Sequence, residues 1–233
     1  MSRPILILCA HGTRDADGQE AVLTVAQQVR DALEVDVRVA YVDVQEPTID
    51  DVVAGIGASE EGLSAIIVPY LLSGGYHVHV DIARAVADRP DVVAAPPLGP
   101  DRRLVAIMLD RIVAAEVHPT ATLVLAPAGS SDPRSTQDTE KVLDELRLTW
   151  DGPVRVGYAS GIEPTVTQAV KDARAFGEDD EDGDVAVVSY LLSPGIFQRV
   201  LTKADADHVT EPLGPDPRII EIITERYCDA GGA

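Results

Sequence analysis

The chain alternates short, uninterrupted apolar runs with longer segments whose apolar residues recur at helical spacing. Such apolar runs are typical of parallel strands buried on both faces, and their alternation with helices predicts right-handed β-α-β units. In the first half we predict strands at residues 4–10, 35–41, 65–70 and 92–95, and helices at 19–33, 48–56, 80–87 and 102–116. In the second half we predict strands at 121–126, 154–158, 185–190 and 209–213, with helices between them. The pattern indicates an α/β fold.

The sequence also repeats itself. Four segments recur in the same order in the second half: Arg38-Val-Ala-Tyr41 as Arg155-Val-Gly-Tyr158, Glu46-Pro-Thr48 as Glu163-Pro-Thr165, Tyr70-Leu-Leu-Ser73 as Tyr190-Leu-Leu-Ser193, and Pro97-Leu-Gly-Pro-Asp101 as Pro212-Leu-Gly-Pro-Asp216. Their displacements lie between 115 and 120 positions, which indicates a duplicated module. We predict two tandem, similar three-layer α/β modules, residues 1–118 and 119–233, each with a mainly parallel four-stranded sheet and with a cleft between them.

The composition narrows the choice of partners. A formal net charge of -20 argues against nucleic acid or an anionic membrane surface as the main partner. Cys9 and Cys228 form neither a disulfide framework nor a metal-ligand spacing, and no apolar segment approaches the ~20 residues of a membrane helix. The acidic run at residues 178–184 is interpreted as a solvated loop, with cation binding as the alternative. We therefore expect a cytoplasmic protein with no nucleic acid and no membrane among its partners.

Three polar side chains follow three successive predicted strands of the first module. His11 ends the first strand, Glu46 follows the second and His77 follows the third. Because the carboxyl ends of parallel strands meet at one edge of a sheet, we expect these groups to share a site. A single histidine there would most often be structural. Two imidazoles and a carboxylate, however, are suitable ligands for a divalent first-row metal, and neutral imidazole is an effective base near pH 7.

The loop before His77 leaves one alternative open. Gly74 and Gly75 let the backbone approach a bulky ligand closely, and Tyr76 is interpreted as packing or as a pocket wall. His79 is either a spare ligand or a surface residue. An extended segment would point it the same way as His77, whereas a helix would make the two side chains diverge.

Three motifs together resemble the sirohydrochlorin chelatase family: Ala10-His-Gly-Thr-Arg-Asp15, Gln45-Glu-Pro-Thr48 and Leu71-Leu-Ser-Gly-Gly-Tyr-His-Val-His-Val-Asp-Ile82. The internal duplication resembles the long form of that family. The resemblance implies that His11 is the proton acceptor and a metal contact, that His77 is the second metal contact, and that Glu46 is a carboxylate near the metal or the substrate. The residues then expected to bind the substrate are Gly12, Thr13, Arg14, Glu46, Leu72, Ser73, Gly74, Gly75, Tyr76 and, from the second module, Arg199.

The same resemblance implies the activity. It is an ATP-independent lyase that inserts Fe²⁺ or Co²⁺ into a sirohydrochlorin-type tetrapyrrole with release of two protons, in sirohaem or cobalamin biosynthesis. No tightly bound cofactor is expected, since the divalent metal is a substrate, and the internal pseudo-dimer is expected to be a monomer. A protein that carries a tetrapyrrole or a metal without turnover is the alternative.

The second module departs from this pattern. Ala128 stands where the first module has His11, and Phe197 stands where it has His77, so we expect one active site per chain. A tetrapyrrole rich in carboxylates also needs local positive charge on an acidic protein. Arg14, Arg134 and Arg199 are the candidates.

Two other enzyme classes are disfavoured. A histidine phosphatase has an arginine before its nucleophilic histidine, and here Ala10 takes that place. Gly55-Ile-Gly57 lacks the third glycine of a dinucleotide-binding fingerprint, which argues against a dehydrogenase.

Overall fold

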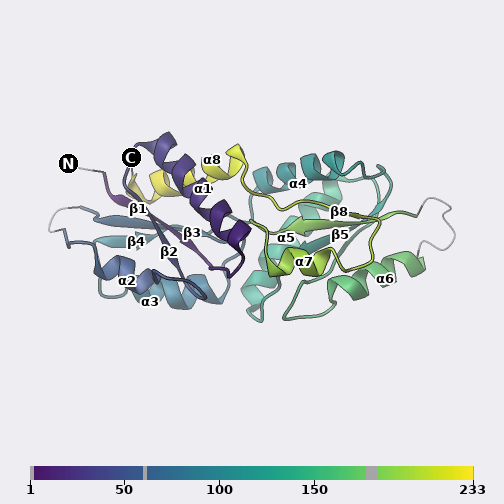
Figure 1. Ribbon diagram of the computed structural model, residues 1–233, viewed down its shortest axis with the longest axis horizontal. Helices are drawn as coiled ribbons and strands as arrows, with labels where there is room; N and C mark the ends of the chain where they lie inside the picture. Colours follow the sequence, from purple (N-terminus) through teal and green to yellow (C-terminus); the bar gives the residue numbers. More distant parts are fainter. Residues whose placement is uncertain (1–2, 60–61, 177–182, 233) are drawn as a thin grey trace. The chain divides into compact units, whose positions relative to one another are not determined.

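The computed structural model describes residues 3–59, 62–176 and 183–232, and it forms two compact units, each built on a four-stranded parallel sheet (Figure 1). The predicted α/β class and the four parallel strands in each copy are therefore confirmed. Most of the predicted acidic loop lies outside the described residues.

The first unit has the strand order β2-β1-β3-β4. Its strands are β1 (Ile5–Ala10), β2 (Val37–Tyr41), β3 (Ala65–Tyr70) and β4 (Val92–Ala94). Helices α1 (Ala16–Leu33) and α8 (Pro217–Tyr227) cover one face, while α2 (Ile49–Ala54), the π-helical turn η1 (His77–Ile82) and α3 (Ala83–Val86) cover the other (Figure 1). Every side chain of β3 is buried, as expected for a strand covered on both faces.

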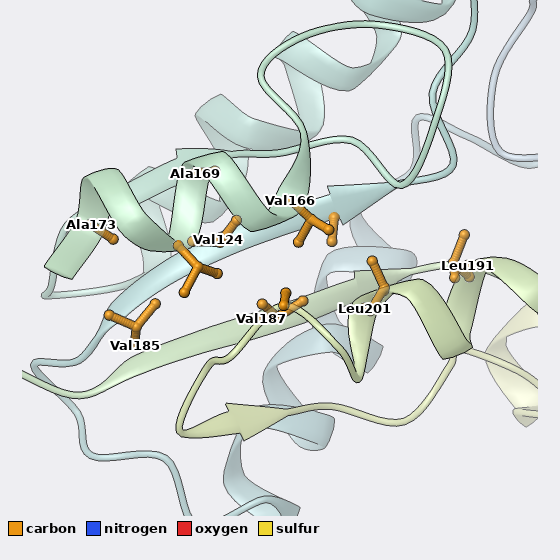
Figure 2. Close-up of a cluster of buried hydrophobic side chains, with 11 residues drawn as sticks. Val124, Val166, Ala169, Ala173, Val185, Val187, Leu191 and Leu201 are labelled. Carbon is orange, nitrogen blue, oxygen red and sulfur yellow. The ribbon is translucent and has the colours of Figure 1, made fainter.

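The second unit repeats this order as β6-β5-β7-β8. Its strands are β5 (Thr122–Pro127), β6 (Val154–Val156), β7 (Val185–Tyr190) and β8 (His208–Val209), and its helices are α4 (Arg102–Ala114), α5 (Pro133–Thr149), α6 (Val166–Phe176) and α7 (Ile196–Leu201). Figure 2 shows how Val124 and Val187 of the central strands meet Ala169 of α6 and Leu201 of α7. Small and branched side chains here let the helices approach the sheet closely.

The last helix of each sequence copy packs with the other copy. The compact units consist of Met1–Gly99 with Pro215–Ala233, and of Pro100–Gly214. They differ from the predicted modules 1–118 and 119–233, because α4 packs against β7 and α5, whereas α8 packs against β3 and α1. Repeated sequence fixes which helix follows which strand, but it does not fix which of two equivalent sheets that helix covers.

The two exchanged helices are equivalent in detail. They bury the same four positions, Leu104, Ile107, Met108 and Ile112 in α4 and Ile219, Ile222, Ile223 and Tyr227 in α8. Arg111 Nε donates to the Pro212 carbonyl at 3.2 Å, and its counterpart Arg226 Nε donates to the Pro97 carbonyl at the same distance. Each unit therefore fixes the helix that enters it through the same arginine contact.

Several predicted boundaries shift. The helix predicted at 80–87 begins earlier, at His77, with a π-helical turn. The fourth strand of the second copy, predicted at 209–213, is only the pair His208–Val209, since the chain turns away before Pro212. The helix predicted from residue 19 starts at Ala16, because the Asp15 side chain caps it by accepting from the Gly18 amide.

Two further findings bear on the environment of the chain. Within the described residues, no helix has both the length and the apolar character needed to cross a membrane. Both cysteines are free, with Cys9 buried in β1.

Candidate metal centre

The structure brings the two predicted histidines together. His11 follows β1 and His77 opens η1 after β3, the neighbouring strand of the sheet. Their imidazole rings meet edge to face, with centroids 4.6 Å apart and an interplanar angle of 82°. The two imidazoles are therefore direct neighbours at this edge of the sheet.

The turn that carries His11 is held against the loop after β2. Gly12 has φ 97°, and a Cβ there would collide with the Asp43 carbonyl, so only glycine suits the position. The Asp43 amide donates to the His11 carbonyl at 3.0 Å, and the Thr13 amide donates to Gln45 Oε1 at 2.7 Å. These contacts fix the direction in which His11 leaves the sheet.

Thr13 has a structural part in the same turn. Its carbonyl accepts from Gln19 Nε2 at 2.8 Å, and its hydroxyl accepts from the Asp15 amide at 3.1 Å. Because these groups are engaged, Thr13 shapes the turn. Its predicted contact with the substrate remains a proposal.

His77 has a carboxylate partner that the sequence analysis missed. Its Nδ1 lies at hydrogen-bond distance, 2.8 Å, from Asp81 Oδ2. Asp81 Oδ1 also lies 3.4 Å from Arg84 Nη1, and Arg84 Nη2 donates to Asp50 Oδ2 at 2.8 Å. The spacing of four residues between His77 and Asp81 is the sequence feature that could predict this contact. It does so only if the helix is known to start at His77.

The surroundings of His11 and Cys9 shift the pKa values of both side chains. The pKa of His11 is lowered from 6.5, first by desolvation of its ring and then by the neighbouring His77. His11 is therefore neutral at pH 7, the state in which imidazole binds a metal or accepts a proton. Burial and the charge of Asp81 raise the pKa of the Cys9 thiol to about 12, so Cys9 does not act as a thiolate ligand.

Arg14 follows His11 by three residues in the turn before α1. Arg14 is exposed, and it is the one arginine for which the structure shows no hydrogen bond or ion pair with another described residue. Arg134, a second candidate for binding substrate carboxylates, is held by Asp132 through contacts of 3.0 and 2.7 Å. Arg14 is thus the better candidate for an external anion.

The loop from β3 to η1 carries the remaining predicted contacts of the first unit, which are Leu72, Ser73, Gly74, Gly75 and Tyr76. Gly74 is buried, whereas the Tyr76 side chain is 55% exposed. The Tyr76 ring lies edge to face with His77 at 5.8 Å between centroids. It therefore offers an aromatic surface beside the histidine pair.

Glu46 does not complete a three-ligand set in this structure. It is exposed, and among the described residues it forms no hydrogen bond or ion pair with either imidazole. Among the described residues no group of three His, Cys, Asp or Glu side chains is placed to hold a metal ion. In the second copy the equivalent Glu163 accepts from the Thr165 amide at 2.8 Å, a role that needs no metal.

His79 and Arg199 lie on short helices. His79 is exposed, and its amide donates to the Gly75 carbonyl, which shows that the segment is helical and that His79 diverges from His77. Arg199 is exposed on α7 of the second unit, and its predicted contact with the substrate remains a proposal.

The second unit has the same backbone turn as the first, but it lacks the counterparts of both histidines. Gly129 has φ 92° and repeats the turn of Gly12, but Ala128 precedes it, and Phe197 packs against the apolar core. Nearby, Gln198 Nε2 donates to the Thr210 carbonyl at 2.9 Å and Ser189 Oγ donates to Gln198 Oε1 at 2.7 Å. These hydrogen bonds link α7 to β7 and to the residue that follows β8.

Comparison with known proteins agrees with the duplication. The CbiX family model matches residues 5–115 and again residues 122–230. A sirohydrochlorin cobaltochelatase of Methanopyrus kandleri is 31% identical, over 47% of this chain and 96% of that protein. A protein of the same name from Methanothermobacter thermautotrophicus is 26% identical, over 48% of this chain and 94% of that protein.

Solved structures share the fold. SirB from Bacillus subtilis with Fe³⁺ superposes with a TM-score of 0.75 and 23% identity, covering 98% of this chain and 95% of that one. The sirohydrochlorin chelatase SirB of Bacillus subtilis subspecies spizizenii in complex with cobalt gives a TM-score of 0.72 at 20% identity, with the same coverage. The two-unit α/β architecture is therefore a known one.

Proposed function

The chain belongs to the CbiX family, and from that premise we propose that it is a sirohydrochlorin chelatase that inserts Co²⁺ or Fe²⁺ into the tetrapyrrole without ATP. The observation that carries the proposal is the pair His11 and His77, whose rings lie 4.6 Å apart at the strand ends of the first unit. Relatives named sirohydrochlorin cobaltochelatase support the substrate class.

The pair suits the reaction on chemical grounds. Metal insertion needs ligands that replace water on the ion and then release it, and it needs a base for the two pyrrole protons. Two imidazoles form an open shell that leaves positions for pyrrole nitrogens, whereas a closed set of four protein ligands would retain the metal. The lowered pKa of His11 keeps its ring neutral near pH 7, so it can accept one of the protons.

Arg14 and Tyr76 supply two further groups suited to binding the tetrapyrrole, one charged and one aromatic. The exposed guanidinium of Arg14 has no partner among the described residues and suits a peripheral carboxylate of the tetrapyrrole. The exposed ring of Tyr76 suits the apolar face of the macrocycle. On this proposal the metal is a substrate, no tightly bound cofactor takes part, and the chain acts as a monomer in the cytoplasm.

The test is steady-state metallation of sirohydrochlorin by the purified chain, followed by visible absorption with Co²⁺ and with Fe²⁺ in separate reactions. Many turnovers per chain with either ion, above the rate without protein, are expected. A change that stops at one equivalent of tetrapyrrole would instead identify a carrier. The ratio of kcat/KM for the two ions then assigns the metal.

A further inference from the structure

The two copies differ by one residue at the helix that carries His77. The Gly75 carbonyl accepts from the His79 amide, and the Gly195 carbonyl accepts from the Arg199 amide, so the two glycines are equivalent. Ile82 and Leu201 are the first fully buried side chains that follow them. The first copy spans this interval with one residue more, which its π-helical turn accommodates. Single π-turns inside helices are frequent at functional sites.

The longer turn places a carboxylate beside the imidazole. Asp81 directly precedes Ile82, its side chain is 15% exposed, and its Oδ2 lies 2.8 Å from His77 Nδ1. In the second copy the residue before Leu201 is Val200, and Phe197 replaces His77. The copy that lacks the counterpart of His77 therefore lacks the counterpart of this carboxylate as well.

The carboxylate determines which nitrogen of the neutral His77 ring carries the proton. An ionised carboxylate only accepts hydrogen bonds, so the proton of neutral His77 must lie on Nδ1. The lone pair of the neutral ring then lies on Nε2, the nitrogen left for a metal. Arg84 Nη1 lies 3.4 Å from the other carboxylate oxygen, Asp81 Oδ1.

We propose that Asp81 is a positioning residue, which fixes the His77 ring and its tautomer so that Nε2 receives the incoming divalent metal. The inference rests on the proposed function, because that function makes His77 a metal contact. Asp81 itself touches neither metal nor tetrapyrrole. A carboxylate behind a metal-binding histidine typically contributes 10- to 100-fold to metal affinity or activity.

The first experiment measures Co²⁺ affinity without tetrapyrrole, by titration calorimetry on the full chain. We expect Asp81→Ala to weaken Co²⁺ binding by about 10- to 100-fold, and Asp81→Asn, which keeps an acceptor oxygen, to lie between it and the wild type. Asp50→Asn removes the outer partner of Arg84 and is the matched control, with affinity near that of the wild type.

A double-mutant cycle separates positioning from a general structural effect. In a His77→Ala background, Asp81→Ala should weaken Co²⁺ binding no further, because its effect passes through His77. An equal loss in both backgrounds would overturn the inference. So would Asp81→Ala that binds Co²⁺ as tightly as the wild type.

The second experiment needs no metal. Long-range ¹H–¹⁵N correlation at about pH 8, above the ordinary histidine pKa, distinguishes the two neutral tautomers. We expect His77 in the Nδ1–H form, assigned by its absence in His77→Ala, and a mixture of tautomers in Asp81→Ala. A wild-type ring in the Nε2–H form would overturn the inference. Wild-type protein that binds Co²⁺ but does not metallate sirohydrochlorin would refute the proposed function and leave this test intact.

Discussion

Val44 and Gly161 occupy equivalent positions in the two copies, and both have a left-handed backbone, with φ 65° and 84°. Glycine adopts this region at little cost, whereas a β-branched residue there is strained by about 1–3 kcal/mol. The Val44 side chain is 46% exposed, so it contributes little to a core that would offset the strain. The first copy therefore retains strain in the loop that contacts the His11 turn.

We expect Val44→Gly to raise the free energy of unfolding by about 1 kcal/mol, because released strain exceeds the added flexibility of glycine in the unfolded chain. Urea denaturation checks this. Gly161→Val is the matched variant and should lower stability by about 1–3 kcal/mol, since a Cβ at Gly161 has room and only the backbone conformation is unfavourable. Equal stability of Val44→Gly and the wild type would show that the loop relaxes around valine.

Tyr70 and Tyr190 form a second contrasting pair. Both rings are buried at the ends of equivalent strands, but among the described residues the Tyr70 hydroxyl has no hydrogen-bond partner. The pKa of Tyr190 is raised by burial and by Asp138 and Asp101, so acidic groups lie near its hydroxyl. We expect Tyr70→Phe to raise stability by about 1 kcal/mol, because an unsatisfied buried hydroxyl is removed, and Tyr190→Phe to lower it by a similar amount. Thermal unfolding of both variants tests this. A loss of stability in Tyr70→Phe would contradict the assignment of the Tyr70 hydroxyl as unsatisfied.

Much of the fold follows from the sequence for identifiable reasons. Buried parallel strands must be apolar throughout, so strand β3 at Ala65–Tyr70 was predicted residue for residue. The histidine pair follows from the same logic, since strand ends in a parallel sheet converge on one edge.

Other features depend on contacts that no local pattern contains. The partnership of His77 with Asp81 depends on a helix that starts three residues before its predicted beginning. Glu46 was grouped with the histidines because it also follows a strand, but strand order alone does not fix where a long side chain points. The exchange of α4 and α8 depends on a choice between two similar sheets, which share the same surface pattern.

The site predicts a hierarchy among histidines. We expect His11→Ala and His77→Ala each to lower the metallation rate by a factor of about 10² or more, the scale of losing a general base or a metal ligand. His79→Ala should be much milder, because its helical position directs it away from His77. Initial rates on variants with unchanged circular dichroism test this. A loss in His79→Ala as large as that in His77→Ala would show that the wrong histidine was chosen.

We expect His11 to set the pH dependence of metallation. Because the pKa of His11 is lowered below 6.5, its ring stays neutral to lower pH than in an unfolded chain. The metallation rate should therefore be half-maximal at a pH below 6.5 and rise from there towards neutral pH. The sign for stability is the same: the unfolded chain binds this proton more readily, so His11 lowers stability as the pH falls through that range. A metallation rate that is half-maximal at or above pH 6.5 would contradict the lowered pKa.

Glu46 can be tested against its own counterpart. If its carboxylate assists the metal or the substrate, Glu46→Gln should lower kcat/KM for metallation by about 10-fold or more, the lower range for loss of an assisting group. Glu163→Gln removes the equivalent carboxylate from the unit that lacks the counterparts of His11 and His77, and it should leave the rate unchanged. Equal, small effects of both changes would assign Glu46 to the structural role that Glu163 has toward Thr165.

The exchange of helices makes the strongest prediction about architecture. Residues 1–118 alone would lack α8, which packs against β3 and α1, and would keep α4, which normally packs against β7 and α5. Because α4 buries positions equivalent to those of α8, the α4 of one fragment can take the α8 place on a second fragment. We therefore expect this fragment to form a dimer by mutual exchange of α4, with a molar mass by light scattering of twice the chain.

A spliced chain should behave differently. Joining residues 1–99 directly to residues 215–233 preserves the shared Pro-Leu-Gly-Pro-Asp segment and returns α8 to its own sheet without a partner. We expect it to be a folded monomer that retains His11 and His77 and binds Co²⁺ with an affinity within about 10-fold of the full chain, since both proposed ligands and Asp81 lie in this unit. Light scattering and calorimetry on both proteins give the answer. A spliced chain that dimerises as the fragment does would show that exchange of α4 is not what causes dimerisation. A fragment that folds as a monomer would show that β3 does not need a helix from a second chain.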